Sequence, residues 1–221
     1  MRSGYLFDLD GTLVTYDPGT PGIFENACRE AGVEPTEAAL EAIGPGYVET
    51  FREFEESPYV GAARAAREAG LAIDPRTFAA HYVEAELAAT RVPDGTANLL
   101  SELSPVGVVT NGYGPVQRRK LSETGLDDRI DAVVCADDVE AFKPDDEPFD
   151  AIEAAIDASE YVVVGDSIEY DVQPANERGH RTVFVGPDTE TGGEADGSGS
   201  DATPDIRLED PSELASLRNR F

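Results

Sequence analysis

Long apolar runs are missing from this sequence of 221 residues, although 40% of its residues are hydrophobic. No run approaches the ~20 residues that a helix needs to cross a bilayer, so a helical membrane protein is not expected. The apolar pattern also enters an expected strand almost at the first residue, which leaves no room for a signal peptide. The overall apolar share predicts a packed globular core, and we expect a cytoplasmic protein.

Cysteine is scarce as well. Cys28 and Cys135 are the only two, and their surroundings indicate a helix and a strand. Such a pair could form a disulfide, but two buried thiols in a reducing cytosol fit the sequence better. A fold held together by disulfides is therefore not expected.

Positive charge is the third scarce feature. The chain has 45 acidic residues against 17 basic ones, for a net charge of −28, and its only lysines are Lys120 and Lys143. Nucleic acids and anionic membrane surfaces are poor partners for such a chain. Its self-repulsion opposes compact folding in dilute buffer, whereas ~1 M salt shortens the Debye length to ~3 Å. The composition resembles that of proteins from salt-accumulating halophiles; the alternative is an ordinary acidic protein.

One stretch organises the rest of the chain, Tyr-Leu-Phe-Asp-Leu-Asp-Gly-Thr-Leu at residues 5–13. Its apolar beginning is typical of a short buried strand in a parallel sheet. Asp8 and Asp10 follow at the carboxyl end of that strand, where open α/β sheets place their ligands. Two carboxylates this close repel each other unless a cation neutralises them, which points to Mg²⁺. Gly11 permits a tight turn, and Thr12 offers a hydroxyl and a backbone N–H to an anion.

The rest of the sequence divides into a helical part and an alternating part. Residues 17–91 have helical periodicity and contain no convincing strand. From residue 92 onward strands alternate with helices, which predicts a parallel, doubly wound sheet. We therefore predict an α/β fold with a Rossmann-like core, residues 1–16 plus 92–221, and an all-helical domain inserted after the first strand.

Two local details of this pattern are also predictions. We expect Gly44-Pro45-Gly46 to break a helix of the inserted domain, because proline and glycine both disfavour a helix interior. The polar residues 187–204 contain almost nothing apolar and are expected to form a solvated loop.

Polar groups follow three of the later strand segments. Thr110 and Asn111 follow one strand, Lys143 precedes a proline after the next, and Asp166 and Asp171 follow the third. Together with the first stretch, these groups resemble the four motifs of the haloacid dehalogenase superfamily, many members of which are phosphohydrolases. The resemblance covers about residues 4–15 and 92–186. It leaves unspecified the inserted domain, which in that family covers the active site.

The resemblance implies a role for each group. Asp8 would be the nucleophile that forms an aspartyl-phosphate, and Asp10 the general acid–base. Thr110 is similar to the hydroxyl that binds a phosphoryl oxygen, and Lys143 to the cation that neutralises phosphate and keeps the nucleophile ionised. Because lysine is so rare here, one retained before Pro144 favours a need for its compact ammonium.

Two sets of ligands follow from the same resemblance. The substrate-binding set comprises Thr12, Thr110, Asn111 and Lys143. The Mg²⁺ set comprises Asp8, the backbone carbonyl of Asp10, Asp166 and Asp171, with waters completing the octahedron. The last of these would be either a second ligand or an anchor behind the ligands.

The implied function is a Mg²⁺-dependent phosphatase that acts on a small phosphorylated metabolite. A phosphomutase or a dehalogenase of the same superfamily is an alternative, although dehalogenases lack the second aspartate of the first motif. A phospho-accepting signalling module shares the acidic residues, Thr, Lys and Mg²⁺, but places its phosphorylated Asp on a later strand and has no large helical insert. No motif identifies the residues that would select the substrate, and none bears on the oligomeric state.

Overall fold

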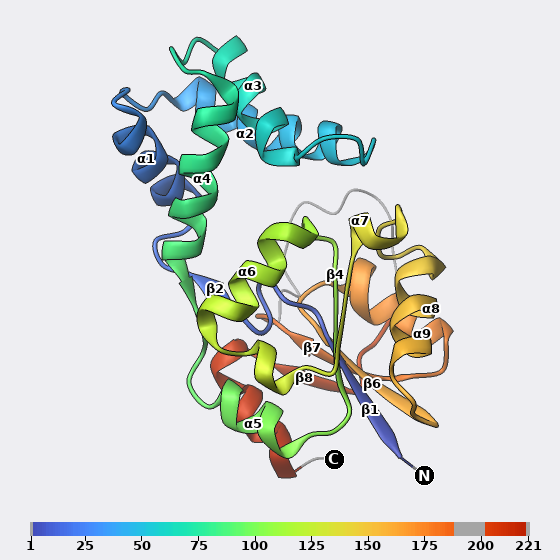
Figure 1. Ribbon diagram of the computed structural model, residues 1–221. Helices are drawn as coiled ribbons and strands as arrows, with labels where there is room; N and C mark the ends of the chain where they lie inside the picture. The colour runs from blue at the N-terminus through green and yellow to red at the C-terminus, as the bar shows by residue number, and fades with distance from the viewer. Residues whose placement is uncertain (1, 188–201, 220–221) are drawn as a thin grey trace. The chain divides into compact units, whose positions relative to one another are not determined.

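The computed structural model describes residues 2–187 and 202–219 (Figure 1). The chain divides into two compact units, one made of Met1–Thr15 with Val92–Phe221 and the other of Tyr16–Arg91. Two short strands, β2 (Thr15–Tyr16) and β3 (Thr90–Arg91), pair with each other where the chain leaves and rejoins the first unit. Most of the predicted solvated loop, residues 188–201, lies outside the described residues.

The first unit is built on a six-stranded sheet in the order β5-β4-β1-β6-β7-β8, and all neighbouring strands are parallel. The strands are β1 (Ser3–Phe7), β4 (Val106–Thr110), β5 (Ala132–Cys135), β6 (Glu160–Gly165), β7 (Arg181–Val185) and β8 (Ile206–Leu208). With β1 in the middle, the carboxyl ends of β1, β4 and β6 lie side by side. This arrangement confirms the predicted α/β fold with a doubly wound parallel sheet.

One face of the sheet is covered by helices of the middle and end of the chain. Phe7, Val108 and Val164 are level with one another in the sheet and contribute to one buried cluster. The helices that pack against this cluster are α5 (Thr96–Glu102), α6 (Gly114–Thr124) and the 3-10 helix η3 (Pro211–Asn219).

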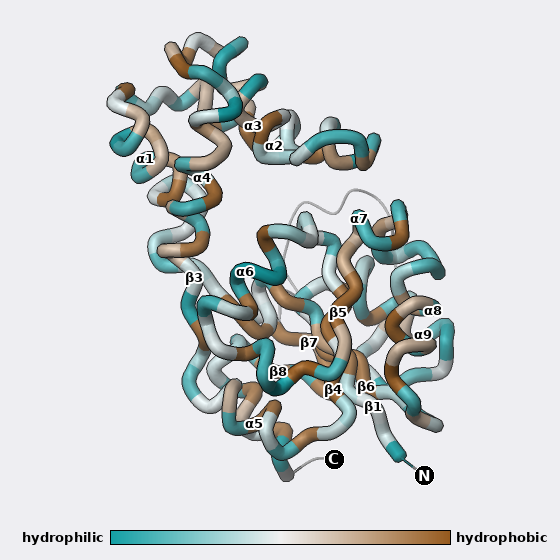
Figure 2. Tube along the Cα trace, in the orientation of Figure 1, coloured by the Kyte–Doolittle hydropathy of each residue, from teal (hydrophilic) through white to brown (hydrophobic). Residues whose placement is uncertain are grey.

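The opposite face carries the neighbouring residues of the same strands. Leu6, Val109 and Val163 form a second buried cluster with two further helices, α8 (Asp146–Ala155) and α9 (Gln173–Glu177). Since both faces of the sheet are covered, apolar residues follow one another in the strands rather than alternating with polar ones, and much of the sheet is brown in Figure 2. The described part of this unit also contains the short helical segments η1 (Asp127–Arg129), α7 (Ala136–Val139) and the π-helical η2 (Ile168–Val172).

The second unit is helical, apart from its shares of β2 and β3. Its helices are α1 (Thr20–Ala31), α2 (Glu37–Phe51), α3 (Pro58–Glu68) and α4 (Pro75–Ala89). Aromatic rings hold them together: Tyr59 of α3 stacks edge-on against Tyr47 of α2, with ring centroids 5.2 Å apart, and also contacts Tyr82 of α4 at 6.0 Å. These aromatic residues are therefore packing residues of the helical unit.

The predicted helix break at Gly44-Pro45-Gly46 is wrong, because α2 continues through it to Phe51. The reason is the crossing of α2 with α3. A Cβ atom at Gly46 would lie 2.5 Å from the Cβ of Ala65 and 2.8 Å from the carbonyl oxygen of Gly61. The two helices therefore approach each other closely, and this packing outweighs the ~3 kcal/mol that a proline costs inside a helix.

Both cysteines are free and buried, which confirms the prediction of thiols rather than a disulfide. Burial, helped by the nearby Glu25, raises the pKa of the Cys28 thiol to about 11. Burial also raises the pKa of Cys135 to about 12. Neither thiol is therefore ionised near neutral pH, as expected of unreactive core cysteines. Within the described part of the chain, no helix combines the length and apolar character needed to cross a bilayer.

Candidate active site

Asp8 stands at the carboxyl end of β1, in the middle of the sheet. Its backbone N–H donates to the carbonyl oxygen of Val164 at 2.9 Å, so the chain is still held like a strand there. Its side chain reaches the ammonium of Lys143, whose Nζ lies 2.8 Å from Asp8 Oδ1 and 2.6 Å from Asp171 Oδ1. All three residues are buried. The predicted nucleophile and the predicted phosphate-binding lysine are thus in direct contact.

Lys143 is held in place by Asn111 at the end of β4. The amide of Asn111 donates to the carbonyl oxygen of Lys143 at 2.9 Å and accepts from its backbone N–H at 2.7 Å. We predicted Asn111 to bind substrate, but the structure gives its side chain a different task. It ties the end of β4 to the segment between α7 and α8 that carries the lysine.

Both carboxylate oxygens of Asp171 are engaged in hydrogen bonds. Its Oδ1 receives Lys143, and its Oδ2 accepts from the backbone N–H of Ser167 at 3.1 Å. A Cβ atom at Gly165 would overlap the Asp171 carboxylate, which explains why a glycine precedes Asp166. With both oxygens engaged, Asp171 orients Lys143, and this favours the anchoring role among the two that the sequence left open.

Asp166 lies at the exposed rim of the same edge, against the turn that contains Gly11. Gly11 has a φ of +89°, and a Cβ atom there would overlap the Asp166 carboxylate. Partial desolvation, and then repulsion from Asp171, raise the pKa of the Asp166 carboxyl to about 6, with Lys143 opposing them. A pocket of about 340 Å³, lined in part by Gly11 and Asp166, lets solvent reach this side.

The charges at this edge suit a divalent cation. Asp8, Asp166 and Asp171 repel one another, and Lys143 compensates for only one of them. Burial, opposed by Lys143 and reinforced by the two other aspartates, raises the pKa of Asp8 to about 8. Burial and the neighbouring aspartates thus disfavour the charged form of Asp8, and a further positive charge at this edge would favour it. The donor set fits Mg²⁺, which takes one or two carboxylates and keeps several waters.

Three of the four predicted metal ligands are side chains, those of Asp8, Asp166 and Asp171, and the fourth is the backbone carbonyl of Asp10. Within residues 2–187 and 202–219, no group of three or more His, Cys, Asp or Glu side chains is arranged to hold a metal. The physical reason is that Asp171 is engaged with Lys143 and the side chain of Asp10 with a second lysine. Asp8 and Asp166 remain as the two carboxylates that could bind a cation.

That second lysine, Lys120, was not identified as a site residue from the sequence. It lies on α6, and its Nζ is 2.8 Å from Asp10 Oδ1. Gln117, one turn earlier on α6, donates from Nε2 to Asp10 Oδ2 at 2.5 Å and to Thr110 Oγ1 at 2.9 Å. A signal was available for Lys120, because the scarcity of lysine that singled out Lys143 applies equally to it.

The two predicted phosphate-binding threonines are both buried but differ in their hydrogen bonds. Thr110 ends β4, and its Oγ1 accepts from the N–H of Gly112 at 3.1 Å as well as from Gln117. Thr12 is fully buried, and its backbone N–H donates to Leu9 at 3.3 Å. Its hydroxyl has no hydrogen-bonding partner among the described residues. The turn closes on itself, so neither group of Thr12 is presented to an anion in the way that we expected.

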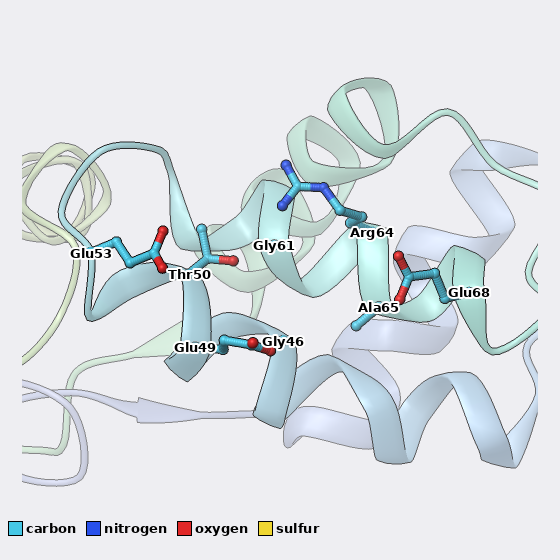
Figure 3. A pocket seen from close by; sticks show the side chains of 8 residues that line it. All are labelled: Gly46, Glu49, Thr50, Glu53, Gly61, Arg64, Ala65 and Glu68. Atoms are coloured by element: carbon cyan, nitrogen blue, oxygen red, sulfur yellow. The ribbon is translucent and has the colours of Figure 1, made fainter.

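The helical unit contains a separate pocket of about 290 Å³ between α2 and α3, beside the Gly46–Gly61 crossing. Figure 3 shows its lining, in which three glutamates (Glu49, Glu53 and Glu68) accompany Arg64. The guanidinium of Arg64 pairs with Glu56 at 2.5 Å. With its one cation paired and three acidic residues around it, this pocket does not suit a phosphorylated ligand.

The sequence matches the family model of the haloacid dehalogenase-like hydrolases over residues 5–185. The chain belongs to this family. It is 30% identical to a ribulose-1,5-bisphosphate 5-phosphatase of Halopiger xanaduensis, with 98% of this chain and 99% of that protein covered. It is 31% identical to a phosphoglycolate phosphatase of Rhodospirillum rubrum, with 76% and 73% covered.

Solved structures of the family share its fold. The HAD-hydrolase YfnB from Bacillus subtilis, solved bound to magnesium, superposes with a TM-score of 0.74 at 19% identity, with 99% of this chain and 100% of that chain covered. At this identity the likeness concerns the fold alone. The family match and the phosphatase relatives confirm the prediction of an enzyme, a hydrolase of the phosphoric monoester class.

Proposed function

We propose that this hydrolase is a Mg²⁺-dependent phosphatase that acts on a small phosphomonoester through an aspartyl-phosphate on Asp8. The observation that carries the proposal is the contact between Asp8 and the buried Lys143 at the end of the central strand, 2.8 Å from Oδ1 to Nζ. Phosphoryl transfer needs a positioned nucleophile and strong compensation of negative charge. Asp8 at this strand end would be the positioned nucleophile, and Lys143 would supply part of the charge compensation.

Each residue of the site has a task in this proposal. Asp8 attacks phosphorus, and Lys143 orients it and attracts the phosphoryl oxygens. Thr110 donates its hydroxyl to a phosphoryl oxygen. When bound, Mg²⁺ would be held by Asp8, Asp166 and the backbone carbonyl of Asp10, and it would neutralise charge on the phosphoryl group.

Asp10 moves the protons. As an acid, it protonates the oxygen of the leaving alcohol when the ester bond breaks. As a base, it then takes a proton from the water that attacks the aspartyl-phosphate, which releases inorganic phosphate and restores Asp8. About a third of its side chain is exposed, so the carboxylate can be reached by a leaving group and by water.

The substrate that we propose to test first is a sugar phosphate. The support for it is the Halopiger relative, which is named for ribulose-1,5-bisphosphate and matches this chain along nearly the whole length of both. Phosphoglycolate comes second, because the relative from Rhodospirillum is named for it.

A substrate panel with and without metal tests this function. In molar KCl, we expect release of inorganic phosphate from at least one small phosphomonoester with Mg²⁺ present. The release should disappear with EDTA, return with Mg²⁺ and be weak with Ca²⁺, whose looser coordination misplaces the nucleophile. Full turnover in EDTA would contradict the metal requirement. Halide release from a 2-haloacid without phosphate release would contradict the proposed reaction.

We also propose that the protein works in a salt-rich cytoplasm, as its net charge of −28 suggests. The thermal midpoint should rise markedly between 0.05 M and 2 M KCl, because screening removes self-repulsion. Sucrose at matched osmolality is the control, since it stabilises by exclusion and does not screen charge. A high midpoint that stays the same across this range of KCl contradicts the proposal.

A further inference from the structure

We propose that Lys120 and Gln117 are positioning residues that hold the Asp10 carboxylate and the Thr110 hydroxyl in one fixed arrangement. This inference rests on the proposed function, because it assigns Asp10 the movement of protons. Both residues lie on the same side of α6, three positions apart, and both are buried. Neither belongs to the motifs from which the active site was predicted.

The burial of Lys120 is energetically unfavourable by itself. Its side chain is 2% exposed, and a buried ammonium destabilises a fold unless it is paired. The rest of the chain avoids lysine, since all but two of its 17 basic residues are arginines. A compact ammonium can approach one carboxylate oxygen and leave the remaining lone pairs of that carboxylate accessible, whereas an arginine fork tends to cover both oxygens.

Gln117 extends this contact to the phosphate-binding group. Its amide nitrogen lies 2.5 Å from Asp10 Oδ2 and 2.9 Å from Thr110 Oγ1. Asp10 Oδ2 accepts from the NH₂ group of this amide and Oδ1 accepts from Lys120, so each oxygen keeps a lone pair for the proton that Asp10 would transfer. With Lys120 on one oxygen and Gln117 on the other, the Asp10 carboxylate is held against rotation about its terminal bond.

The same amide determines what Thr110 can do. Thr110 Oγ1 accepts from Gln117 and from the N–H of Gly112, at 2.9 and 3.1 Å. Two accepted bonds fill both lone pairs of a hydroxyl oxygen, so the hydroxyl hydrogen must be donated elsewhere. Gln117 therefore makes Thr110 a committed donor, which is the role that a phosphoryl oxygen requires. Through one amide, the acid–base and the phosphate-binding hydroxyl are positioned together.

The test uses Lys120→Met and Gln117→Met, which remove the polar contacts and change the volume little. Two phosphate esters are compared at saturating Mg²⁺ in molar KCl, p-nitrophenyl phosphate and an alkyl phosphate. The alkyl ester needs a proton on its leaving oxygen, and p-nitrophenolate does not. We expect Lys120→Met to lower kcat for the alkyl ester by about 10²-fold or more, with a much smaller loss in the first turnover of p-nitrophenyl phosphate.

Gln117→Met should show the same selective loss and in addition a raised KM for both esters, because Thr110 is no longer a committed donor. Arg119→Met is the matched control on the same helix; it removes an exposed ion pair with Glu123 and should leave both rates unchanged. A further test compares the double variant Lys120→Met/Asp10→Asn with Asp10→Asn alone. If Lys120 acts through Asp10, adding Lys120→Met to Asp10→Asn should cause little further loss on the alkyl ester.

The outcomes separate this inference from the proposed function. If the folded Lys120→Met and Gln117→Met variants keep the wild-type ratio of the two ester rates, the positioning role is wrong, while phosphorylation of wild-type Asp8 still supports a phosphatase. Fully additive losses in the double variant would contradict the role as well. If the wild-type protein hydrolyses no ester and acquires no phosphoryl group, the proposed function and this inference are both wrong. Should Lys120→Met fail to fold, the ratio of the two ester rates in Gln117→Met alone decides whether the positioning role is right.

Discussion

Asp8→Asn should lower turnover by roughly 10⁴-fold or more, which corresponds to about 5 kcal/mol in the activation barrier. An amide cannot form the acyl phosphate that the proposed reaction passes through, so no later step can compensate. We expect the variant to stay folded, because Lys143 keeps its second partner, Asp171, at 2.6 Å. Initial rates on the best ester of the panel measure the loss.

The covalent intermediate provides an independent check on Asp8. Wild-type protein quenched in acid during turnover should carry one phosphoryl group in the peptide that contains Asp8, and Asp8→Asn should carry none. Asp146→Asn is a suitable control, since it removes a carboxylate that is 82% exposed and pairs with Arg178 on the surface. A phosphoryl group on another peptide, or turnover by Asp8→Asn within tenfold of wild type, would show that Asp8 is not the nucleophile.

Asp10→Asn should separate the phosphorylation of Asp8 from the later hydrolysis of the aspartyl-phosphate. With an alkyl phosphate the variant should be nearly inactive, because no group protonates the departing oxygen. With p-nitrophenyl phosphate the leaving group departs without a proton, so Asp8 can still be phosphorylated. The aspartyl-phosphate then accumulates, because no base activates the water. We expect a burst of p-nitrophenol close to one equivalent per site, followed by a slow steady state.

Rapid mixing with absorbance detection measures the burst, and intact mass should show one added phosphoryl group at its end. Both the burst and the mass change should be absent in the double variant Asp8→Asn/Asp10→Asn, which serves as the control. If Asp10→Asn turns over p-nitrophenyl phosphate continuously at the wild-type rate, Asp10 is not the acid–base. The proposed sequence of steps would then be wrong.

The parts of the site that could be predicted from the sequence are those that local pattern controls. Asp8 follows directly on a buried strand; of the strands on either side, β4 ends with Thr110 and β6 is followed by Asp166. Because parallel strands bring their carboxyl ends to one edge, recognising each strand was enough to bring these residues together. Lys143 was assigned to the same site because it precedes Pro144, as in the motif that it resembles, and because lysine is rare in this chain.

What the sequence did not reveal depends on contacts between distant segments. Gln117 meets Asp10 across 107 positions of the chain, and its place on α6 has no local signature. The directions of the Asn111 and Thr12 side chains are likewise set by tertiary hydrogen bonding and by burial, which no spacing encodes. Pro45 shows the same limit for the fold, since a helix crossing outweighed a strong local preference.

The burial of both lysines has a practical consequence for labelling. Lys120 and Lys143 are the only lysines of the chain, and each side chain is 2% exposed. The surface therefore presents no lysine amine to acylating reagents, amine crosslinkers or biotin esters in the folded protein. Slow acylation of a lysine would report an opening of the Lys120–Asp10 or the Lys143–Asp8 ion pair. A reagent that labels most proteins at many surface lysines would here report on the proposed active site alone.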